Sequence, residues 1–195
     1  RLAMPHKSRP AALILTRQAV PIFDRSKMAA ASGLAKGAYV LADADGGQPD
    51  VILIGTGSEV ALCVAAGDLL AKDNIKARVV SMPCWELFEE QPEAYRRRVL
   101  PGGPVRVAIE AGSPQGWHRY VGAAGRVIGL DRFGESAPAN ELFEHFGFTT
   151  DNVVAVVPGR GDPSRHGGRH PGVAAHGAHA GDADGVFAAS RPLLR

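Results

Sequence analysis

The chain has 195 residues, a formal net charge of +2 and 45% hydrophobic residues, which is enough for one domain of ordinary size with additional segments. No apolar run approaches the roughly 20 residues that a membrane-spanning helix needs, so we expect no membrane partner. Five arginines and three aspartates from residue 159 onward carry the whole excess charge, and the neutral remainder gives no basic surface for nucleic acid.

The two cysteines also restrict the class of protein. Cys63 and Cys84 have no metal-ligand spacing, so we predict neither a disulfide nor a structural metal site. Free thiols fit a reducing compartment, and the first residues show no signal-peptide pattern, so we expect a cytoplasmic location.

The first predicted structural unit lies in the N-terminal part of the chain. Residues 11–15 form an apolar run after Pro10 that predicts a strand, and the polar residues TRQ (16–18) follow it. Open α/β sheets bind ligands at the carboxyl ends of their strands, which makes Arg17 the best site candidate. Its guanidinium could bind a phosphate or carboxylate through two hydrogen bonds, although an arginine after a strand is more often part of a salt bridge or a solvated residue at the rim. Residues 19–36 are typical of a linker with one helical turn.

A strand, a glycine turn and a helix form the centre of the predicted fold. Residues 51–54 are a β-branched run, GTGSE (55–59) follows, and apolar residues then recur at helical spacing to residue 72. We expect Ser58 to cap this helix and Glu59 to lie in its first turn. The turn lacks the third glycine of a dinucleotide fingerprint, and Glu59 would repel phosphate, so a structural turn is favoured over an anion site.

The remaining patterns complete an α/β prediction: a mostly parallel five-stranded sheet with one antiparallel edge strand and helices on both faces. Strands are expected at residues 38–42, 77–82, 105–110 and 126–130, with residues 43–47 forming a hairpin turn into the strand at Val51. Later helices are expected to begin near Pro92, after a Ser136 cap, and after a cap at Thr150 or Asp151.

Three other groups of residues have alternative functional interpretations. Glu110 ends a predicted strand and could be a site carboxylate, but pairing with His118 or Arg119 is favoured. His118 has no second titratable partner at a persuasive spacing, which weakens an acid-base role. The arginine run 96–98 is interpreted as a solvated surface paired with nearby glutamates rather than as an anion site.

The last part of the sequence differs in composition from the rest. Residues 158–195 are rich in Gly, Ala, His, Arg and Pro and have too few large apolar residues for a core, so we predict a disordered tail. Its irregularly spaced histidines indicate adventitious metal affinity rather than a formed site. A reading-frame change near Val157 is one hypothesis for the abrupt shift.

Several motifs in order along the chain resemble transketolase. They are ALILTRQ (12–18), IGTGSEV (54–60), ARVVSMP (77–83), FGESAP (133–138) and FGFT (146–149). The resemblance runs from the first residue to about Val157. It implies that residues 1–37 are the end of a pyrimidine-binding domain with its linker, that residues 38–157 are a transketolase C-terminal domain, and that residues 158–195 lie outside the family pattern.

The resemblance also implies a reaction and its participants. Transketolases transfer a two-carbon ketol unit between sugar phosphates, use thiamine diphosphate with Mg²⁺ or Ca²⁺, and act as homodimers. The family arginine that contacts the substrate phosphate matches Arg17, whereas no catalytic, metal-binding or cofactor-binding residue of the family falls in this chain. We therefore expect the isolated chain to be inactive and to bind no cofactor. The alternatives are a related thiamine diphosphate enzyme, such as dihydroxyacetone synthase or a pyruvate dehydrogenase β subunit, and a non-catalytic interaction module.

Overall fold

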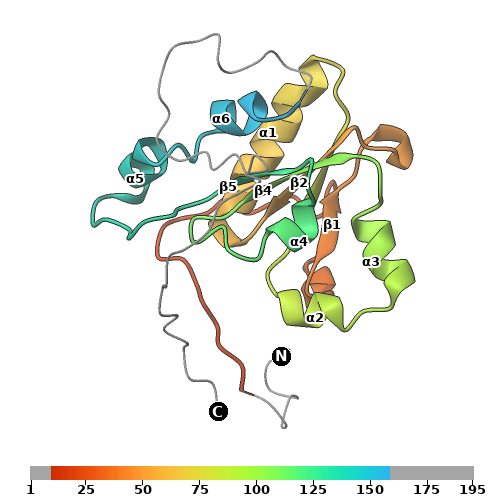
Figure 1. Ribbon diagram of the computed structural model, residues 1–195, viewed down its shortest axis with the longest axis horizontal. Helices are drawn as coiled ribbons and strands as arrows, with labels where there is room; N and C mark the ends of the chain where they lie inside the picture. The colour runs from red at the N-terminus through yellow and green to blue at the C-terminus, as the bar shows by residue number, and fades with distance from the viewer. Residues whose placement is uncertain (1–9, 159–195) are drawn as a thin grey trace, which may run out of the picture.

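The computed structural model describes residues 10–158, and a single sheet lies at the centre of that region (Figure 1). Its strand order is β1-β3-β2-β4-β5. β3, β2, β4 and β5 are parallel to one another, while β1 is antiparallel to β3 at one edge. This confirms the predicted α/β class with a mostly parallel five-stranded sheet. The strands are β1 (Tyr39–Ala42), β2 (Val51–Gly55), β3 (Ala77–Ser81), β4 (Val105–Ile109) and β5 (Arg126–Ile128).

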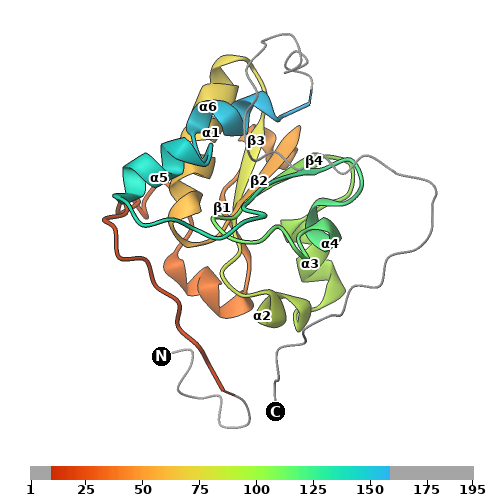
Figure 2. The ribbon, with the colours of Figure 1, turned by 60° about the vertical axis from the view of Figure 1, so that its left-hand side comes forward.

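Helices cover both faces of this sheet, as the sequence predicts. Figure 2 shows α1, α5 and α6 on one side and α2, α3 and α4 on the other. No helix within the described residues is long and apolar enough to cross a membrane. The α-helices are α1 (Val60–Lys72), α2 (Trp85–Glu89), α3 (Glu93–Val99), α4 (His118–Val121), α5 (Ala139–His145) and α6 (Thr150–Ala155), and the 3-10 helices are η1 (Ala31–Lys36), η2 (Asp45–Gly47) and η3 (Gly57–Glu59).

The central strand β2 connects the hydrophobic cores on the two faces. Val51 and Leu53 belong to the cluster under α1 and α6, whereas Ile52 and Ile54 belong to the cluster under α2 and α4. All four side chains are buried, because successive residues of a strand point to opposite faces and both faces are covered. Burying each such side chain stabilises the fold by about 1.5–3 kcal/mol. This explains why residues 51–54 are all apolar and do not alternate with polar residues.

The predicted hairpin between β1 and β2 is wrong. β1 pairs with β3, with Tyr39 opposite Ser81. The residues between β1 and β2 therefore connect two strands that are not neighbours in the sheet. A charge pair, in addition to apolar packing, holds β1 beside β3. Arg78 of β3 is only 5% exposed, and its Nε and Nη2 donate to the Asp43 carboxylate at 2.7 and 3.0 Å. Asp43 thus pairs with a buried guanidinium and does not start a two-residue turn.

The strand predicted at residues 11–15 is also absent. This segment is irregular, and Leu13, Ile14 and Leu15 are 75%, 94% and 81% exposed. A strand needs a neighbour for its backbone groups, and none of the five strands pairs with this segment. The helical turn that was expected within residues 19–36 is confirmed, because η1 forms there.

The helix caps differ from the predicted ones in all three places. Ser58 lies inside η3, and its hydroxyl donates to Glu59 at 2.7 Å instead of capping α1. Ser136 falls too early, since α5 begins at Ala139 after Pro138 with no side-chain cap. The hydroxyl of Thr149 caps α6 by accepting from the backbone of Asn152 at 3.2 Å. An N-cap precedes the first helical residue, so a shift of one position changes which side chain fills the role.

Candidate functional site at the carboxyl end of the sheet

The segment that contains Arg17 passes the carboxyl end of the sheet. A Cβ added at Gly57 would lie 4.0 Å from the side-chain methyl of Thr16, so Thr16 lies next to the turn that follows β2. Gly57 has a φ of +58°, which glycine tolerates better than other residues. The TRQ residues therefore lie at the edge of the sheet where α/β proteins bind ligands, although the strand expected before them does not form.

Arg17 and Gln18 line a cavity of about 540 Å³ with the first part of α5. The other wall is formed by Ala137, Pro138, Ala139, Leu142 and Phe143. Arg17 is exposed, and it makes no ion pair with any of residues 10–158. An unpaired guanidinium beside apolar walls can accept an anionic group, because little competes for its hydrogen-bond donors.

Glu59 is the buried polar residue of this edge. It is 5% exposed, and its Oε1 accepts from the backbone N–H of Ala111 at 2.6 Å. Its Oε2 accepts from the Ser58 hydroxyl at 2.7 Å. The carboxylate thus joins the turn after β2 to the end of β4. Burial, and then the charge of Glu59, raise the pKa of Cys63 in α1, so this thiol remains protonated and unreactive.

Glu110 lies beside this buried carboxylate at the end of β4. Burial raises the pKa of Glu110 to about 6, the negative charge of Glu59 adds to the shift, and hydrogen bonds from Trp117 and Thr56 oppose it. The predicted pairing with His118 or Arg119 is wrong, because Arg119 instead lies 3.8 Å from Glu89. Glu110 is therefore a half-buried acid at the sheet edge whose pKa lies above its ordinary value.

The described residues do not fit a metal-bound diphosphate. They contain no group of three or more His, Cys, Asp or Glu side chains that could hold a metal ion. The glycine turn after β2, where backbone N–H groups could face a phosphate, holds the buried carboxylate of Glu59 instead. A second negative charge there would be repelled.

The other sequence candidates lie away from this edge. The arginine run is paired as predicted, since Arg96 contacts Glu89 at 2.8 Å and Arg97 contacts Glu93. His118 is exposed at the start of α4. The histidines of the C-terminal region lie outside the described residues, so the adventitious-metal interpretation stays a prediction.

Sequence reasoning missed two parts of this edge. Glu59 reads as an ordinary first-turn acid, and nothing in its local sequence shows that it reaches Ala111, 52 positions later. The apolar wall opposite Arg17 was also missed, although Ala137 and Pro138 belong to the FGESAP motif. That motif was a usable signal, because it was among the stretches that carried the resemblance.

Comparison with known proteins identifies the family. A family model described as the transketolase-like TK C-terminal domain matches residues 37–149. The chain belongs to the transketolase family. It is 54% identical over 157 residues to the transketolase of Aquifex aeolicus, a match that covers 80% of this chain and 23% of that protein. The chain thus spans about a quarter of the length of the curated transketolases that it matches.

Solved transketolase structures agree with the fold. A Pichia stipitis transketolase complex with sedoheptulose-7-phosphate is 38% identical with a TM-score of 0.59, over 66% of this chain and 18% of that one. A structure described as the inactive β4 tetramer of a split-gene transketolase is 25% identical with a TM-score of 0.51, over 71% of this chain and 46% of that one. The mixed sheet with one antiparallel edge is that of the transketolase C-terminal domain.

Proposed function

We propose that this chain forms the C-terminal part of an enzyme that transfers a two-carbon ketol unit from a ketose phosphate to an aldose phosphate. In this proposal residues 38–157 are the C-terminal domain, and residues 1–37 are the end of the pyrimidine-binding domain with its linker. The position of Arg17 carries the proposal: it lies at the carboxyl edge of the sheet, lines a cavity and has no acidic partner among the described residues.

The proposed role of Arg17 is to bind the phosphate of the sugar substrate. A guanidinium remains charged at all physiological pH values and can donate two parallel hydrogen bonds to one phosphoryl group. Gln18, on the same cavity wall, offers an amide that can donate another. These contacts would fix one end of the sugar, so that its reacting carbons are held in one orientation. Arg17 is a binding residue in this account and does not take part in breaking the carbon bond.

Thiamine diphosphate, with Mg²⁺ or Ca²⁺, would supply the chemistry that breaks and forms that bond. Its site is proposed to lie in domains that precede these residues in the family, because the described residues do not fit a metal-bound diphosphate. The sugar phosphates named for the Pichia stipitis structures, such as xylulose-5-phosphate and fructose-6-phosphate, support the proposed substrate class. Matches to transketolases favour this reaction over that of a related thiamine diphosphate enzyme.

Subunit contacts are the second proposed role. The exposed apolar residues fall in the N-terminal segment and in the loop before α5. Leu13, Ile14, Leu15 and Ile22 are 75–99% exposed, and Phe133 is 96% exposed. Large apolar side chains that are this exposed can mark sites that another protein surface covers. We propose that upstream domains and the second subunit of a homodimer cover them.

Replacing Arg17 with alanine in an enzyme that carries the upstream domains tests the binding role. We expect KM for a phosphorylated ketose donor to rise about tenfold to a hundredfold, because the loss of a charged hydrogen bond costs about 1.5–3 kcal/mol. We expect KM for a non-phosphorylated ketose donor to stay unchanged. Arg25→Ala is the control, since Arg25 is an exposed arginine outside the cavity. Equal KM changes for both donors, or no change, would refute the assignment.

The isolated chain provides a second test. We expect it to show no ketol transfer and no binding of thiamine diphosphate by calorimetry in the presence of Mg²⁺. The inactive assembly described for a split-gene transketolase supports this expectation. Saturable cofactor binding would show that the cofactor site lies in this chain after all.

A further inference from the structure

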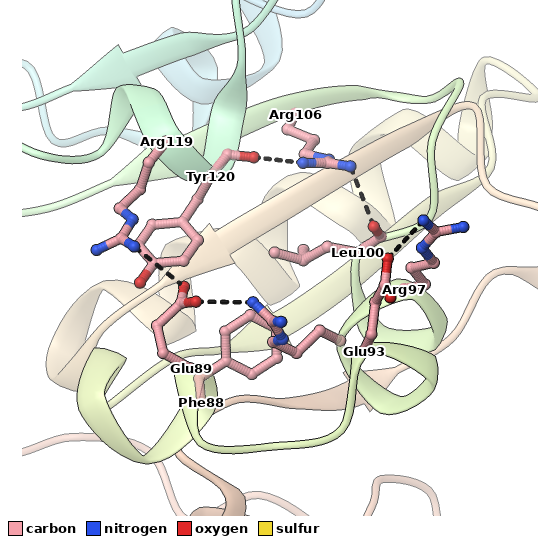
Figure 3. Close-up of a pocket in the computed structure, with 9 residues that line it drawn as sticks. Phe88, Glu89, Glu93, Arg97, Leu100, Arg106, Arg119 and Tyr120 are labelled. Atoms are coloured by element: carbon pink, nitrogen blue, oxygen red, sulfur yellow. Dashed lines mark hydrogen bonds and ion pairs between the residues drawn. The ribbon is translucent and has the colours of Figure 1, made fainter.

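A second cavity lies on the face of the sheet covered by α2, α3 and α4. It has a volume of about 260 Å³, and four arginines and two glutamates line it. Figure 3 shows these side chains converging from α2, α3, β4 and α4. The cavity lining therefore has two more positive than negative charges. The charged residues are Arg96, Arg97, Arg106, Arg119, Glu89 and Glu93.

Arg106 is the cavity arginine whose positive charge is paired with neither Glu89 nor Glu93. It donates to three backbone carbonyls, those of Tyr120 at 2.6 Å, Leu100 at 3.0 Å and Pro101 at 2.9 Å, and it pairs with no carboxylate among residues 10–158. Burial lowers the pKa of Arg106. A half-buried cation held only by neutral dipoles is costly unless an anion reaches it from the open side.

An unpaired hydrogen-bond donor on the cavity wall points to the same conclusion. The Nε of Arg96 is shielded from solvent and has no hydrogen-bond partner among the described residues, whereas the buried hydroxyl of Tyr120 interacts with the side chain of Glu89. Tyr120 is 3% exposed. Burial first, and then the hydrogen bond with Glu89, raise the pKa of Tyr120, so its hydroxyl stays protonated as a donor. Shielded donors are almost always satisfied in folded proteins, so the Nε of Arg96 leaves room for an acceptor from outside the chain.

We propose that this cavity is a binding site for a small anion that carries phosphoryl groups, either inorganic or esterified to an organic group. Arg97 and Arg119, which are 78% and 54% exposed at their side chains, can meet the anion at the mouth, and Arg106 lies deeper. Phosphoryl oxygens suit this lining because each accepts several hydrogen bonds and arginine forks match their geometry. Phe88 and Tyr120 supply an aromatic wall for an organic group.

The site is separate from the proposed substrate site. The Arg17 cavity borders α5, which lies on the opposite face of the sheet from α2, α3 and α4 (Figure 2). No residue lines both cavities. Binding here can therefore be measured on the isolated chain, and its outcome does not depend on the role of Arg17.

Calorimetric titration of the full chain with pyrophosphate tests the proposal, and phenyl phosphate tests whether the aromatic wall favours an ester. We expect saturable binding at one site. Arg97→Gln and Arg119→Gln should each weaken anion binding at least tenfold. Both side chains are largely exposed, so we expect both variants to fold like the unmodified chain. Glu89→Gln should tighten binding severalfold, since it removes a negative charge and frees Arg96 and Arg119. A purely structural role would not produce that gain.

Two matched arginines serve as controls. Arg126 hydrogen-bonds to backbone carbonyls as Arg106 does, but it is paired with Val107 on β4 and therefore faces the other core. Arg25 is exposed, donates to the backbone carbonyl of Ala29 and lines neither cavity. Arg126→Gln and Arg25→Gln should leave the affinity within twofold of the unmodified chain. Absence of saturable binding, or equal losses in the control variants, would overturn the proposal.

Discussion

Two apolar runs with nearly the same local pattern take different structures in this chain. Residues 11–15 and β2 are both short, aliphatic and followed by polar residues. β2 is hydrogen-bonded to β3 on one side and β4 on the other, and Ile54 is fully buried. In the N-terminal segment Ile14 is 94% exposed. The difference shows that neighbours, and not only the local sequence, decide whether such a run becomes a strand.

The role of an arginine in this chain also depends on its surroundings, as Arg17 and Arg78 show. Arg78 is also an arginine that belongs to an aliphatic run, and its carboxylate and carbonyl partners lie within this chain. Arg17 has no such partner among the described residues. In our account its neighbours come from domains that precede it in the family and from the substrate. The same residue type is structural in one region and available for binding in the other.

The largest expected effect comes from shortening one isoleucine in each region. Ile54→Ala should lower the free energy of unfolding by about 3 kcal/mol, because it removes buried methyl groups and leaves a cavity. Ile14→Ala should change it by less than about 0.5 kcal/mol, since that side chain is exposed. Urea denaturation of the isolated chain measures both. Similar losses in the two variants would show that the N-terminal segment is packed in solution.

A pair of arginine variants gives the next largest effect. Arg78→Met should destabilise the isolated chain by about 2 kcal/mol, because it leaves the Asp43 carboxylate and the Gly47 carbonyl without their buried donor. Arg17→Met should leave stability unchanged. The comparison uses the same denaturation assay, and a stable Arg78→Met protein would contradict the explanation given for the position of β1.

The smallest expected effect is a pH dependence of stability at the carboxyl end of the sheet, where the N-terminal segment passes the turn after β2. The pKa of Glu110, about 6 in the folded chain, is raised above its ordinary value, so the folded state binds this proton more tightly than the unfolded state. Glu110 therefore costs stability as the pH rises from about 4.5 through 6. Glu110→Gln should raise the free energy of unfolding by about 1 kcal/mol at pH 7.5, after allowance for solvent screening, and by almost nothing at pH 4.

Denaturation curves at the two pH values measure this difference. Glu141→Gln, which removes the charge of an exposed glutamate on α5, serves as the control for loss of one negative charge. A gain of the same size at both pH values would assign the effect to packing instead of ionisation.

Sequence alone predicted the fold class because each strand of the sheet carries its own apolar pattern. It failed at the pairing of β1, since the Arg78–Asp43 contact joins residues 35 positions apart and has no local signal. It also failed at the strand predicted for residues 11–15, because an apolar run forms a strand only with a pairing partner and none of the five described strands pairs with this segment. Helix caps failed by one or a few positions, within the usual uncertainty of helix ends.

The candidate site was predictable only in part. Arg17 was singled out from its place after an apolar run and from the family motif, and it does line a cavity. The arginine cavity under α2 and α3 could not be predicted, because Arg106 and Arg119 come from segments that the sequence treats as separate. The arginine run at 96–98 was correctly read as paired, yet pairing did not reveal the unmatched Arg106 behind it.

Hydrogen exchange tests the central claim most directly, because it reports whether backbone amides are paired. In the isolated chain we predict strong protection for β2 and none for residues 11–15. In an enzyme that carries the family's upstream domains, we predict that residues 11–15 become protected to a degree similar to β2. Protection of residues 11–15 in the isolated chain, or its absence in the longer enzyme, would contradict the account.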